Sequence, residues 1–466
     1  MKAIFALTAL AVACYLILFA DAKIAVLYPL NGSVVSAPFP VVVQGEKECI
    51  DSLELIGAKR SVDVKKVRQS PTELALHVGL NSAPVTDLTL ESLCQKFQLQ
   101  LQPAASETDV AAKLLESFIK KNPADSLAYD WTTAILLMGV VQYLEVMKGD
   151  SALYKNYVED FFRYHLKRGL PDITQPDLAA ISLAAVDLKN RIGTELNLKP
   201  LIEETQNYFL TEPINSLGAL NHVGTRHRFH RFLPRTENFT SAAVWADSLV
   251  MYALAALKLS QDSGDQSLKK FALAQPQIFA DKLMTSEGLY KHAFYIDSRE
   301  LTPKKSFWSR GNGWVALAFI DFLEVLPEGD VRRKDYAQLF TNHIDAMVKE
   351  LGELKVFKTL LRDENKNNYY ETSSSALVAY AMLKGHRLGF LSADYRNLAL
   401  EMYQNLLGFV VRSEDGTYSL KNISGPTTSS TYDWYYRQWV RPQSDLTYGL
   451  GAFLLLQKEL IKGKSL

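Results

Sequence analysis

The N-terminal part of the chain carries the short alternating pattern of β-strands. Between Lys23 and about Gln102, apolar or alternating runs are separated by Gly, Pro, Ser and Asn. The runs are IAVLYP, FPVVVQG, SLELIG, SVDVKKV, ELALHVGL and FQLQLQ. Alternation of this kind is typical of strands with one buried face. The pattern predicts a small β-sandwich over residues 23–103, in which no cluster of His, Asp or Glu indicates chemistry.

A polar linker at residues 103–109 ends this pattern, and helical periodicity follows it. Several segments, such as WTTAILLMGVVQYLEVM, are apolar on more than one face, which predicts burial on two sides. We expect helices at residues 109–121, 128–148, 151–168, 175–190, 198–209, 241–260, 265–286, 311–326, 332–352, 371–387, 391–408 and 445–461.

These segments form pairs joined by alternating short and long connections, which favours a closed barrel of helical hairpins over residues 105–466. A stacked helical solenoid is the alternative, but no motif recurs at fixed spacing. The long connections at 210–240, 287–310, 353–370 and 409–444 are rich in Gly, Pro, His, Arg and aromatic residues. Long loops in a compact domain are usually functional, so we expect these four to line one mouth of the barrel.

The N-terminus has the composition of a secretory signal over residues 1–22. Lys2 precedes an apolar run from Ala3 to Phe19, and Ala20-Asp21-Ala22 supplies a small-residue cleavage pattern. A membrane anchor is the alternative, because the run approaches the length that spans a bilayer. We favour cleavage and expect a secreted, extracellular protein without a membrane partner.

Cleavage would leave two cysteines, Cys49 and Cys94, in separate candidate strands. In an oxidising compartment they would pair as a disulfide, and two buried free thiols are the alternative. Asn31, Asn238 and Asn422 begin matches to the N-glycosylation acceptor pattern.

Charge and composition exclude several classes of function. Lys+Arg and Asp+Glu both number 51, so no net charge favours a nucleic-acid partner, although a local basic pocket for a small anion remains open. The sequence has no P-loop, no GxGxxG and no GxSxG, so nothing supports nucleotide binding or serine hydrolysis.

Two aspartates are the candidate catalytic residues. Asp247 lies among apolar neighbours in a segment expected to be the middle of a helix, where burial with an arginine or a backbone amide is the alternative to catalysis. Asp177 follows Pro176 at the start of DLAAISLAAV, where a capping carboxylate is the local alternative. If the two acids share a pocket, proximity and desolvation should raise the pKa of one, as glycoside chemistry requires.

Histidines and an arginine fill the long connections. His222, His227, His230 and His292 lack the spacing of a zinc site, so we expect no metal and favour hydrogen bonding to a sugar or a carboxylate. Arg310 lies in FWSRGNGW, where it could bind a substrate carboxylate between aromatic faces or could satisfy helix carbonyls.

Taken together, WADSLVMY, GLYKHAFY, FWSRGNGW, YYETSSSALVAYAM and the terminal YGLGAFLLL resemble glycoside hydrolase family 105. These are the unsaturated rhamnogalacturonyl hydrolases, related to the unsaturated glucuronyl hydrolases of family 88. The resemblance covers roughly residues 105–466 and implies a mainly α (α/α)6 barrel of the six-hairpin glycosidase type. It also implies hydration of the double bond in a 4,5-unsaturated uronic acid at the non-reducing end of small, lyase-generated oligosaccharides, most plausibly from pectin, with no cofactor.

The resemblance also implies roles for individual residues. Asp247 matches the general acid and base of the family, and Asp177 matches its second carboxylate. We expect the substrate-binding side chains to be Trp131, His222, Trp245, His292, Trp308, Arg310, Asn312 and Trp314. The basic segment RHRFHRFLPRTENFT departs from the short link usual in the family, which leaves the substrate details open.

Two other functions remain as alternatives. A sugar epimerase or lyase on the same barrel would depend on His222 and His292 more than on Asp247. A non-catalytic carbohydrate-binding protein would bind sugar through segment 23–103 alone.

Overall fold

We describe the protein from a computed structural model of the full chain. The described residues are 24–35, 39–55, 62–70, 73–80, 87–92, 94–103, 107–147, 151–224 and 242–464. The chain divides into two compact units, Met1–Ala104 with Leu407–Arg412, and Ala105–Leu406 with Ser413–Leu466. The expected signal segment lies outside the described residues. Within them, no helix is long and apolar enough to cross a bilayer.

The first unit is built from two antiparallel sheets and a short pair of strands. One sheet has the order β1 (Ile24–Tyr28), β3 (Phe39–Gly45), β6 (Glu73–Leu80), β5 (Val62–Ser70). The other has the order β4 (Glu54–Leu55), β7 (Asp87–Glu91), β8 (Lys96–Gln100), and β2 (Val34–Val35) pairs with β9 (Gln102–Pro103). Alternate residues such as Val41, Val43, Leu88 and Leu90 share one buried core, so the expected sandwich is confirmed.

The return segment Leu407–Arg412, with β15 (Val410–Arg412), belongs to this first unit, although the sequence gives no sign of it. Ser33 Oγ donates to the carbonyl oxygen of Gly408 at 2.7 Å. The Tyr28 and Phe409 rings pack with centroids 5.3 Å apart. A Cβ at Gly408 would lie 2.0 Å from the Tyr28 ring, which explains the glycine.

Cys49 and Cys94 form the expected disulfide, with Cα atoms 5.5 Å apart. Their expected placement in two strands is wrong. Cys49 lies in the short helix α2 (Lys47–Asp51), and Cys94 lies in the connection between β7 and β8. One turn of helix is long enough to bury Cys49 and Ile50 but too short to show a helical period in the sequence.

Two of the glycosylation candidates lie in the described residues. Asn31 is exposed, and its Oδ1 accepts the backbone N–H of Gln100 at 2.8 Å. Asn422 is half-buried and has the left-handed backbone φ of 57°. Its Nδ2 donates to the carbonyl oxygen of Tyr370 at 3.3 Å, so this amide already has a structural partner. Asn238 lies outside the described residues.

Each of the helical segments expected from the sequence contains a helix. The inner helices are α4 (Trp131–Leu144), α7 (Ile181–Asp187), α9 (Ala255–Ser263), α11 (Ser309–Val325), α13 (Thr372–Arg387) and α15 (Thr447–Lys464). The outer helices are α3 (Glu107–Lys121), α5 (Ala152–Arg168), α8 (Lys199–Thr211), α10 (Gln266–Leu283), α12 (Arg332–Lys349) and α14 (Ala393–Leu407). Shorter helices are η1 (Ala124–Ser126), α6 (Pro176–Ala179), η2 (Leu188–Ile192), η4 (Leu249–Leu254) and η5 (Tyr435–Trp439).

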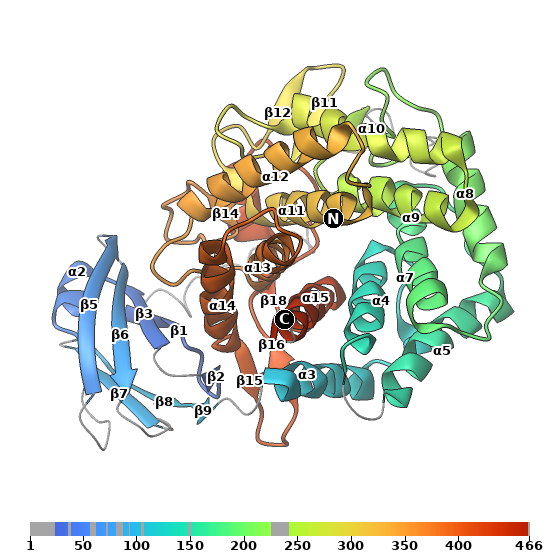
Figure 1. The fold of residues 1–466 in the computed structure, drawn as a ribbon. Coiled ribbons are helices and arrows are strands. Elements are labelled where there is room, and N and C mark those ends of the chain that lie inside the picture. Colours follow the sequence, from blue (N-terminus) through green and yellow to red (C-terminus); the bar gives the residue numbers. More distant parts are fainter. Residues whose placement is uncertain are drawn as a thin grey trace, which may run out of the picture. The chain divides into compact units, whose positions relative to one another are not determined.

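The inner helices close into a ring, seen along its axis in Figure 1. Neighbouring inner helices pack in chain order, and α15 returns to pack against α4. A solenoid would leave its first and last helices apart, so the closed barrel is confirmed. Short strands complete this unit: β10 (Ala243–Trp245), β11 (Ala293–Tyr295), β12 (Glu300–Thr302), β13 (Phe307–Trp308), β14 (Leu360–Leu361), β16 (Tyr418–Leu420), β17 (Ile423–Ser424) and β18 (Pro442–Gln443).

One segment differs from its expected structure. The helix expected to begin at residue 241 is replaced at its start by β10, which pairs with β11. The helix begins only after Asp247, whose carbonyl oxygen accepts the N–H groups of Val250 and Met251. Asp247 therefore lies at the start of a helix, and its expected place in the middle of one is wrong.

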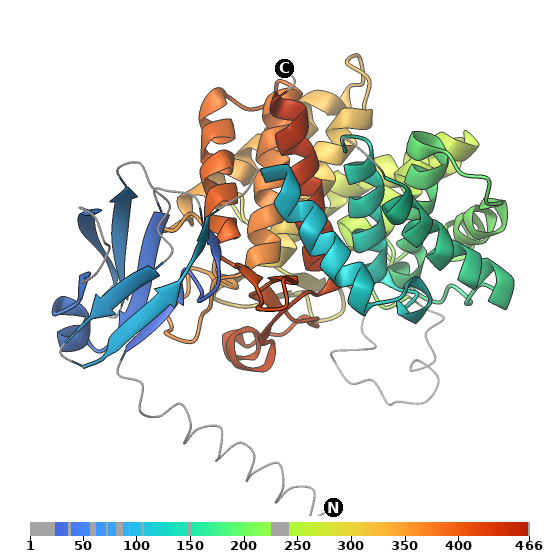
Figure 2. The same ribbon diagram turned by 90° about the horizontal axis from the view of Figure 1, so that it is seen from below.

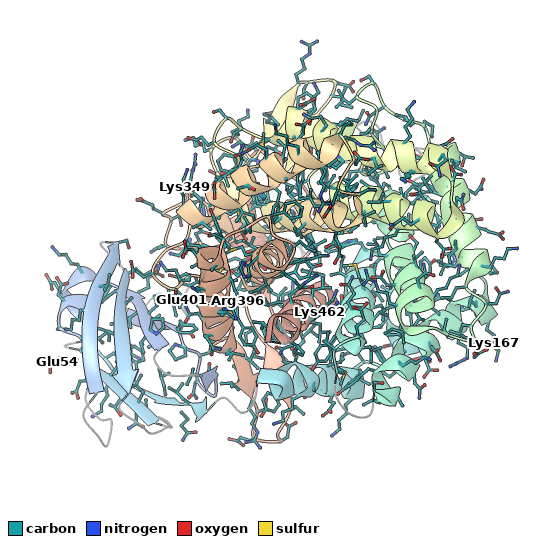
Figure 3. All side chains as sticks on the ribbon, in the orientation of Figure 1. Glu54, Lys167, Lys349, Arg396, Glu401 and Lys462 are labelled. Atoms are coloured by element: carbon teal, nitrogen blue, oxygen red, sulfur yellow. A yellow bond between two sulfur atoms is a disulfide. The ribbon has the colours of Figure 1, made fainter. Side chains whose placement is uncertain are left out.

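A network of buried charges occupies the C-terminal halves of the inner helices. Lys258 Nζ lies 2.6 Å from Asp187 Oδ2, and Lys384 Nζ lies 2.7 Å from both Asp321 and Glu324. Burial opposes the charge of Lys384, but these two acids raise its pKa. The remaining members of the network are Gln142, Glu145, Arg191, Arg387, Lys458, Glu459 and Lys462. Lys462 is labelled in Figure 3, where side chains fill the space between the helices.

The inner helices run in the same direction, so their N-termini share the end of the barrel opposite to this network. In Figure 2, which views the molecule from below, the C-terminus of α15 and the red connection around β16–β18 lie at opposite ends of the barrel. The charge network lies at the end of the barrel where the inner helices end. We call the other end, where these helices begin, the mouth.

Ring closure generates a testable prediction. A Cβ at Gly451 of α15 would lie 2.3 Å from the carbonyl oxygen of Ile135 in α4, and backbone cannot move aside as a side chain can. We expect Gly451→Ala to lower the free energy of unfolding by about 1–3 kcal/mol, measured by urea denaturation.

Gly463→Ala is the matched control in the same helix, because nothing lies within 4 Å of its added Cβ. It should be neutral or slightly stabilising. Equal stability of the two variants would contradict the close approach of α4 and α15.

Candidate active site

Strand pairing places Asp247 beside His292. Trp245 in β10 pairs with Ala293 in β11, and the Ala246 N–H donates to the His292 carbonyl at 2.8 Å. His292 Nε2 then lies 3.2 Å from Asp247 Oδ2. The N–H is not aligned with the carboxylate oxygen, so the contact is an ion pair more than a linear hydrogen bond. Asp247 is 9% exposed and His292 is 1% exposed, so little water screens the pair.

Aromatic rings fix the orientation of His292. Its Nδ1 lies 2.8 Å from the hydroxyl of Tyr436, and its ring centroid lies 4.2 Å from that of Trp308. Trp245 meets the same imidazole edge-on at 5.3 Å. The expected site residues Trp245, His292 and Trp308 therefore lie together around Asp247.

His222 also reaches the site. Its ring stacks on Trp245 with centroids 3.9 Å apart and an interplanar angle of 15°. Its Nδ1 lies 2.8 Å from Ser248 Oγ, one residue after Asp247. Burial lowers the pKa of His222 to about 4, although the charge of Asp247 opposes the shift. The imidazole is therefore neutral near pH 7 and can hydrogen-bond without adding charge.

Asp177 joins the site from α6, which packs against η4. It lies in the first turn of α6 after Pro176, while the N-cap is Gln175. Burial first, and then the negative charges of Asp247 and Asp130, raise the pKa of Asp177 well above its ordinary value. Asp130 itself caps α4 by accepting the Thr132 N–H at 2.9 Å.

The two candidate catalytic acids therefore have opposite pKa shifts. Burial tends to raise the pKa of Asp247, but His292, through its charge and its N–H, and then His222 hold it below the ordinary value. A proton therefore binds more tightly to Asp177 than to Asp247. Two carboxyl groups whose pKa values differ in this way can donate a proton to one atom of a substrate and accept one from water.

Trp131 presents an aromatic surface at the start of α4. It is partly exposed, packs on Tyr448 with centroids 4.8 Å apart, and meets Trp314 edge-on at 6.3 Å. Trp314 is fully buried and supports Trp131 from behind, and its expected contact with substrate stays a prediction. An exposed indole face held in this way suits stacking on a sugar ring.

Arg310 is held by the fold, and its expected role as a carboxylate ligand stays a prediction. Its side chain is fully buried. One Nη donates to the carbonyl oxygen of Ser424, and the other donates to that of Gly425 at 2.8 Å. The guanidinium lies 4.7 Å from the ring centroids of both Trp308 and Tyr448. These carbonyls belong to β17 and its flank, not to a helix, which is why local sequence could not identify them.

Asn312 also makes structural hydrogen bonds, and its expected contact with substrate stays a prediction. Its Oδ1 accepts the Tyr290 N–H at 2.8 Å. Its Nδ2 donates to the carbonyl oxygens of Tyr290 and Trp308, each at 2.9 Å. All of its hydrogen-bonding groups thus hold the approach to α11.

Glu371 and Tyr436 were missed in the sequence. Glu371 is fully buried and accepts the N–H groups of Ser373, Ser374 and Ser424, the last at 3.0 Å. It caps α13 and fixes β17 on the side opposite to Arg310. Glu is not among the preferred N-cap residues, so YYETSSS gave no clear sign of this cap in the sequence. Tyr436 had no local sign either, because its partner His292 is distant in sequence.

No group of three or more His, Cys, Asp or Glu side chains in the described part of the chain could hold a metal ion. The mouth carries carboxyl, imidazole and indole groups. They can hold a proton, orient a polar ring and stack on it.

Comparison with known proteins identifies the family. The model described as Glycosyl Hydrolase Family 88 matches residues 110–464. An unsaturated 3S-rhamnoglycuronyl hydrolase from Alteromonas sp. (strain LOR) is 25% identical over 219 residues, which are 47% of this chain and 51% of that protein. One of the same name from Formosa agariphila is 27% identical over 168 residues, 36% of this chain and 41% of that protein. The matches thus span about half the length of these relatives.

Solved structures agree on the fold. A family 105 glycoside hydrolase from C. acetobutylicum ATCC 824 has a TM-score of 0.66 at 23% identity, over 78% of this chain and 100% of that one. A family 88 glycosyl hydrolase from Bacteroides vulgatus has a TM-score of 0.58 at 18% identity, over 76% and 98%. The resemblance seen in the sequence motifs is confirmed, and the chain belongs to glycosyl hydrolase family 88.

Proposed function

We propose that this protein removes a 4,5-unsaturated uronic acid from the non-reducing end of lyase-generated oligosaccharides. The observation that carries the proposal is the acid pair at the mouth, in which burial and neighbouring negative charges raise the pKa of Asp177 while His292 lowers that of Asp247. The names of the Alteromonas and Formosa relatives, both unsaturated rhamnoglycuronyl hydrolases, support the substrate class. We propose pectin-derived rhamnogalacturonan products as the first substrates to test.

The proposed reaction needs one proton, which the acid pair donates to the substrate and recovers from water. The acid pair donates a proton to C4 of the double bond, and water adds its oxygen at C5 and returns a proton to the pair. The resulting hemiketal becomes a ketone as the C5–O ring bond breaks. The hemiacetal left at C1 then expels the saturated saccharide as an alcohol. We assign Asp247 as the general acid and base, with Asp177 as the partner that stores the proton.

The mouth also suits an anionic sugar. The inner helices place their N-termini there, and the partial positive charge of helix N-termini favours a carboxylate. The Nε1 atoms of Trp245 and Trp308 are buried without a protein partner, so indole N–H groups are available to substrate.

We further propose that the protein is secreted. Two observations support this: the signal-like composition of residues 1–22, and the disulfide between Cys49 and Cys94, which persists best in an oxidising compartment. N-terminal sequencing of protein recovered from culture medium should begin near Lys23. Retention of the first residues would favour the membrane anchor.

The double-bond assay tests the proposed reaction. Rhamnogalacturonan and glycosaminoglycan products of lyases are incubated with the protein, and the loss of ultraviolet absorbance from the double bond is followed. Asp247→Asn cannot exchange a proton, so we expect it to lower kcat by at least about 10³-fold.

The exposed Asp281 of α10 provides the same substitution as a control, and Asp281→Asn should keep full activity. No absorbance loss with any substrate, or full activity in Asp247→Asn, would rule out the proposal. A larger loss in His222 and His292 variants than in Asp247→Asn would favour the epimerase or lyase.

The pH dependence tests the pairing of Asp247 with His292. Asp247 must be ionised to accept a proton, and His292 holds its pKa down while burial raises it. His292→Ala removes the largest lowering influence and leaves burial weakly opposed, so the pKa of Asp247 rises and the acidic limb of kcat/KM should move up by about 1–3 pH units. The control is His386→Ala, which removes an imidazole from the C-terminal end of α13. An acidic limb that stays in place in His292→Ala would contradict the assignment.

A further inference from the structure

Three large aromatic side chains are exposed in the connection that carries Tyr436. Tyr432 is 63% exposed, Trp434 is 47% exposed and Trp439 is 74% exposed. In the described part of the chain, the other large hydrophobic side chains this exposed are aliphatic and scattered: Leu153, Leu210, Ile214 and Val331. Clustered exposed aromatics cost solvation free energy and usually mark a binding surface.

The intervening residues of this segment anchor it to the barrel. Asp433 Oδ1 accepts a hydrogen bond from Ser306 Oγ at 2.7 Å, and Arg437 forms an ion pair with Asp363. Tyr436 is fully buried against His292 and Trp308. The exposed rings are therefore held on a rigid support, which reduces the entropy lost when a ligand binds.

The exposed rings form an extended surface. Tyr432 and Trp434 stack with centroids 6.3 Å apart and an interplanar angle of 30°. Trp434 immediately precedes η5, and Trp439 is its last residue. In a π-helix residue i+5 returns over residue i, so Trp439 lies about one turn beyond Trp434. We call Tyr432, Trp434 and Trp439 the aromatic platform.

The platform lies close along the backbone to Tyr436, a residue of the candidate active site. Trp434 is two residues from Tyr436, so at most about 7 Å of backbone separates their Cα atoms. The Tyr436 hydroxyl in turn lies 2.8 Å from the Nδ1 atom of His292, the partner of Asp247. A saccharide that places its terminal residue at Asp247 would thus have the platform within reach of its next sugar units.

We propose that the aromatic platform binds the saccharide portion that the reaction releases, by stacking on the apolar C–H faces of its pyranose rings. The proposal rests on the proposed function and adds a determinant of substrate length. Unsaturated disaccharides would be too short to use the whole platform, whereas tetrasaccharides would gain its contacts. Because these sugar units do not react, the gain should appear mainly in KM.

Kinetics on substrates of two lengths test the proposal. The ratio of kcat/KM for an unsaturated tetrasaccharide to that for the matching disaccharide is measured in the wild type and in Trp439→Ala. We expect this ratio to fall by about 3- to 10-fold in the variant, mainly through KM of the tetrasaccharide. Trp439→Tyr, which restores an aromatic face, should recover most of the ratio.

Val331→Ala is the control, because Val331 is 87% exposed and lies between α11 and α12, at the end of the barrel away from the mouth. Its ratio should match the wild type. A ratio that stays at the wild-type value in Trp439→Ala would overturn the platform while leaving the proposed function intact. No double-bond loss with any substrate would instead contradict the proposed function.

Two further measurements distinguish failure of the platform proposal from failure of the proposed function. Calorimetry with the saturated trisaccharide product should show weaker binding to Trp439→Ala than to the wild type, whether or not the double-bond reaction occurs. Sedimentation velocity tests whether a second copy of the chain, and not a saccharide, covers the aromatic platform. A dimer that dissociates in Trp439→Ala without any change in the length ratio would overturn the proposal.

Discussion

The close contact between the first and last inner helices is the constraint on which the barrel depends. Gly139 of α4 and Gly451 of α15 have no side chains. The two backbones therefore approach so closely that an added Cβ would collide with the facing backbone. Only with this contact does the row of hairpins become a ring, and closure packs Trp131 at the start of α4 on Tyr448 at the start of α15. Asp177 reaches Asp247 through the neighbouring contact of α6 with η4, which no local sequence feature predicts.

Much of the helical unit could be predicted because its signals are local. Amphipathic periodicity located each helix, and the motif series located the cluster around Asp247. The predictions were wrong where the structure of a short element depends on contact with an element that is distant in the sequence. Residues 243–245 have an apolar pattern that fits either a helix or a strand, and pairing with β11 decided for the strand. Cys49 likewise lies in a single helical turn that is too short to show a period.

Arg310 shows the same limit for the site. Its sequence context, a cation among tryptophans and glycines, fits either a ligand for a carboxylate or a structural cation. Its hydrogen-bond partners are the carbonyl oxygens of Ser424 and Gly425, more than a hundred residues later in the chain. Glu371 accepts the N–H of Ser424, so one peptide segment is held between a buried acid and a buried base. These hydrogen bonds fix β17, but the spacing of residues along the sequence does not indicate them.

The buried charge network has a consequence for how this protein can change. Specific pairing of charges fixes the register of the inner helices at their C-terminal ends, far from the connections that form the mouth. Residues in the mouth connections can therefore be exchanged, lengthened or lost without disturbing the pairs that define the barrel. The barrel and the residues that determine substrate specificity can therefore change independently, so the mouth can adapt to a different saccharide.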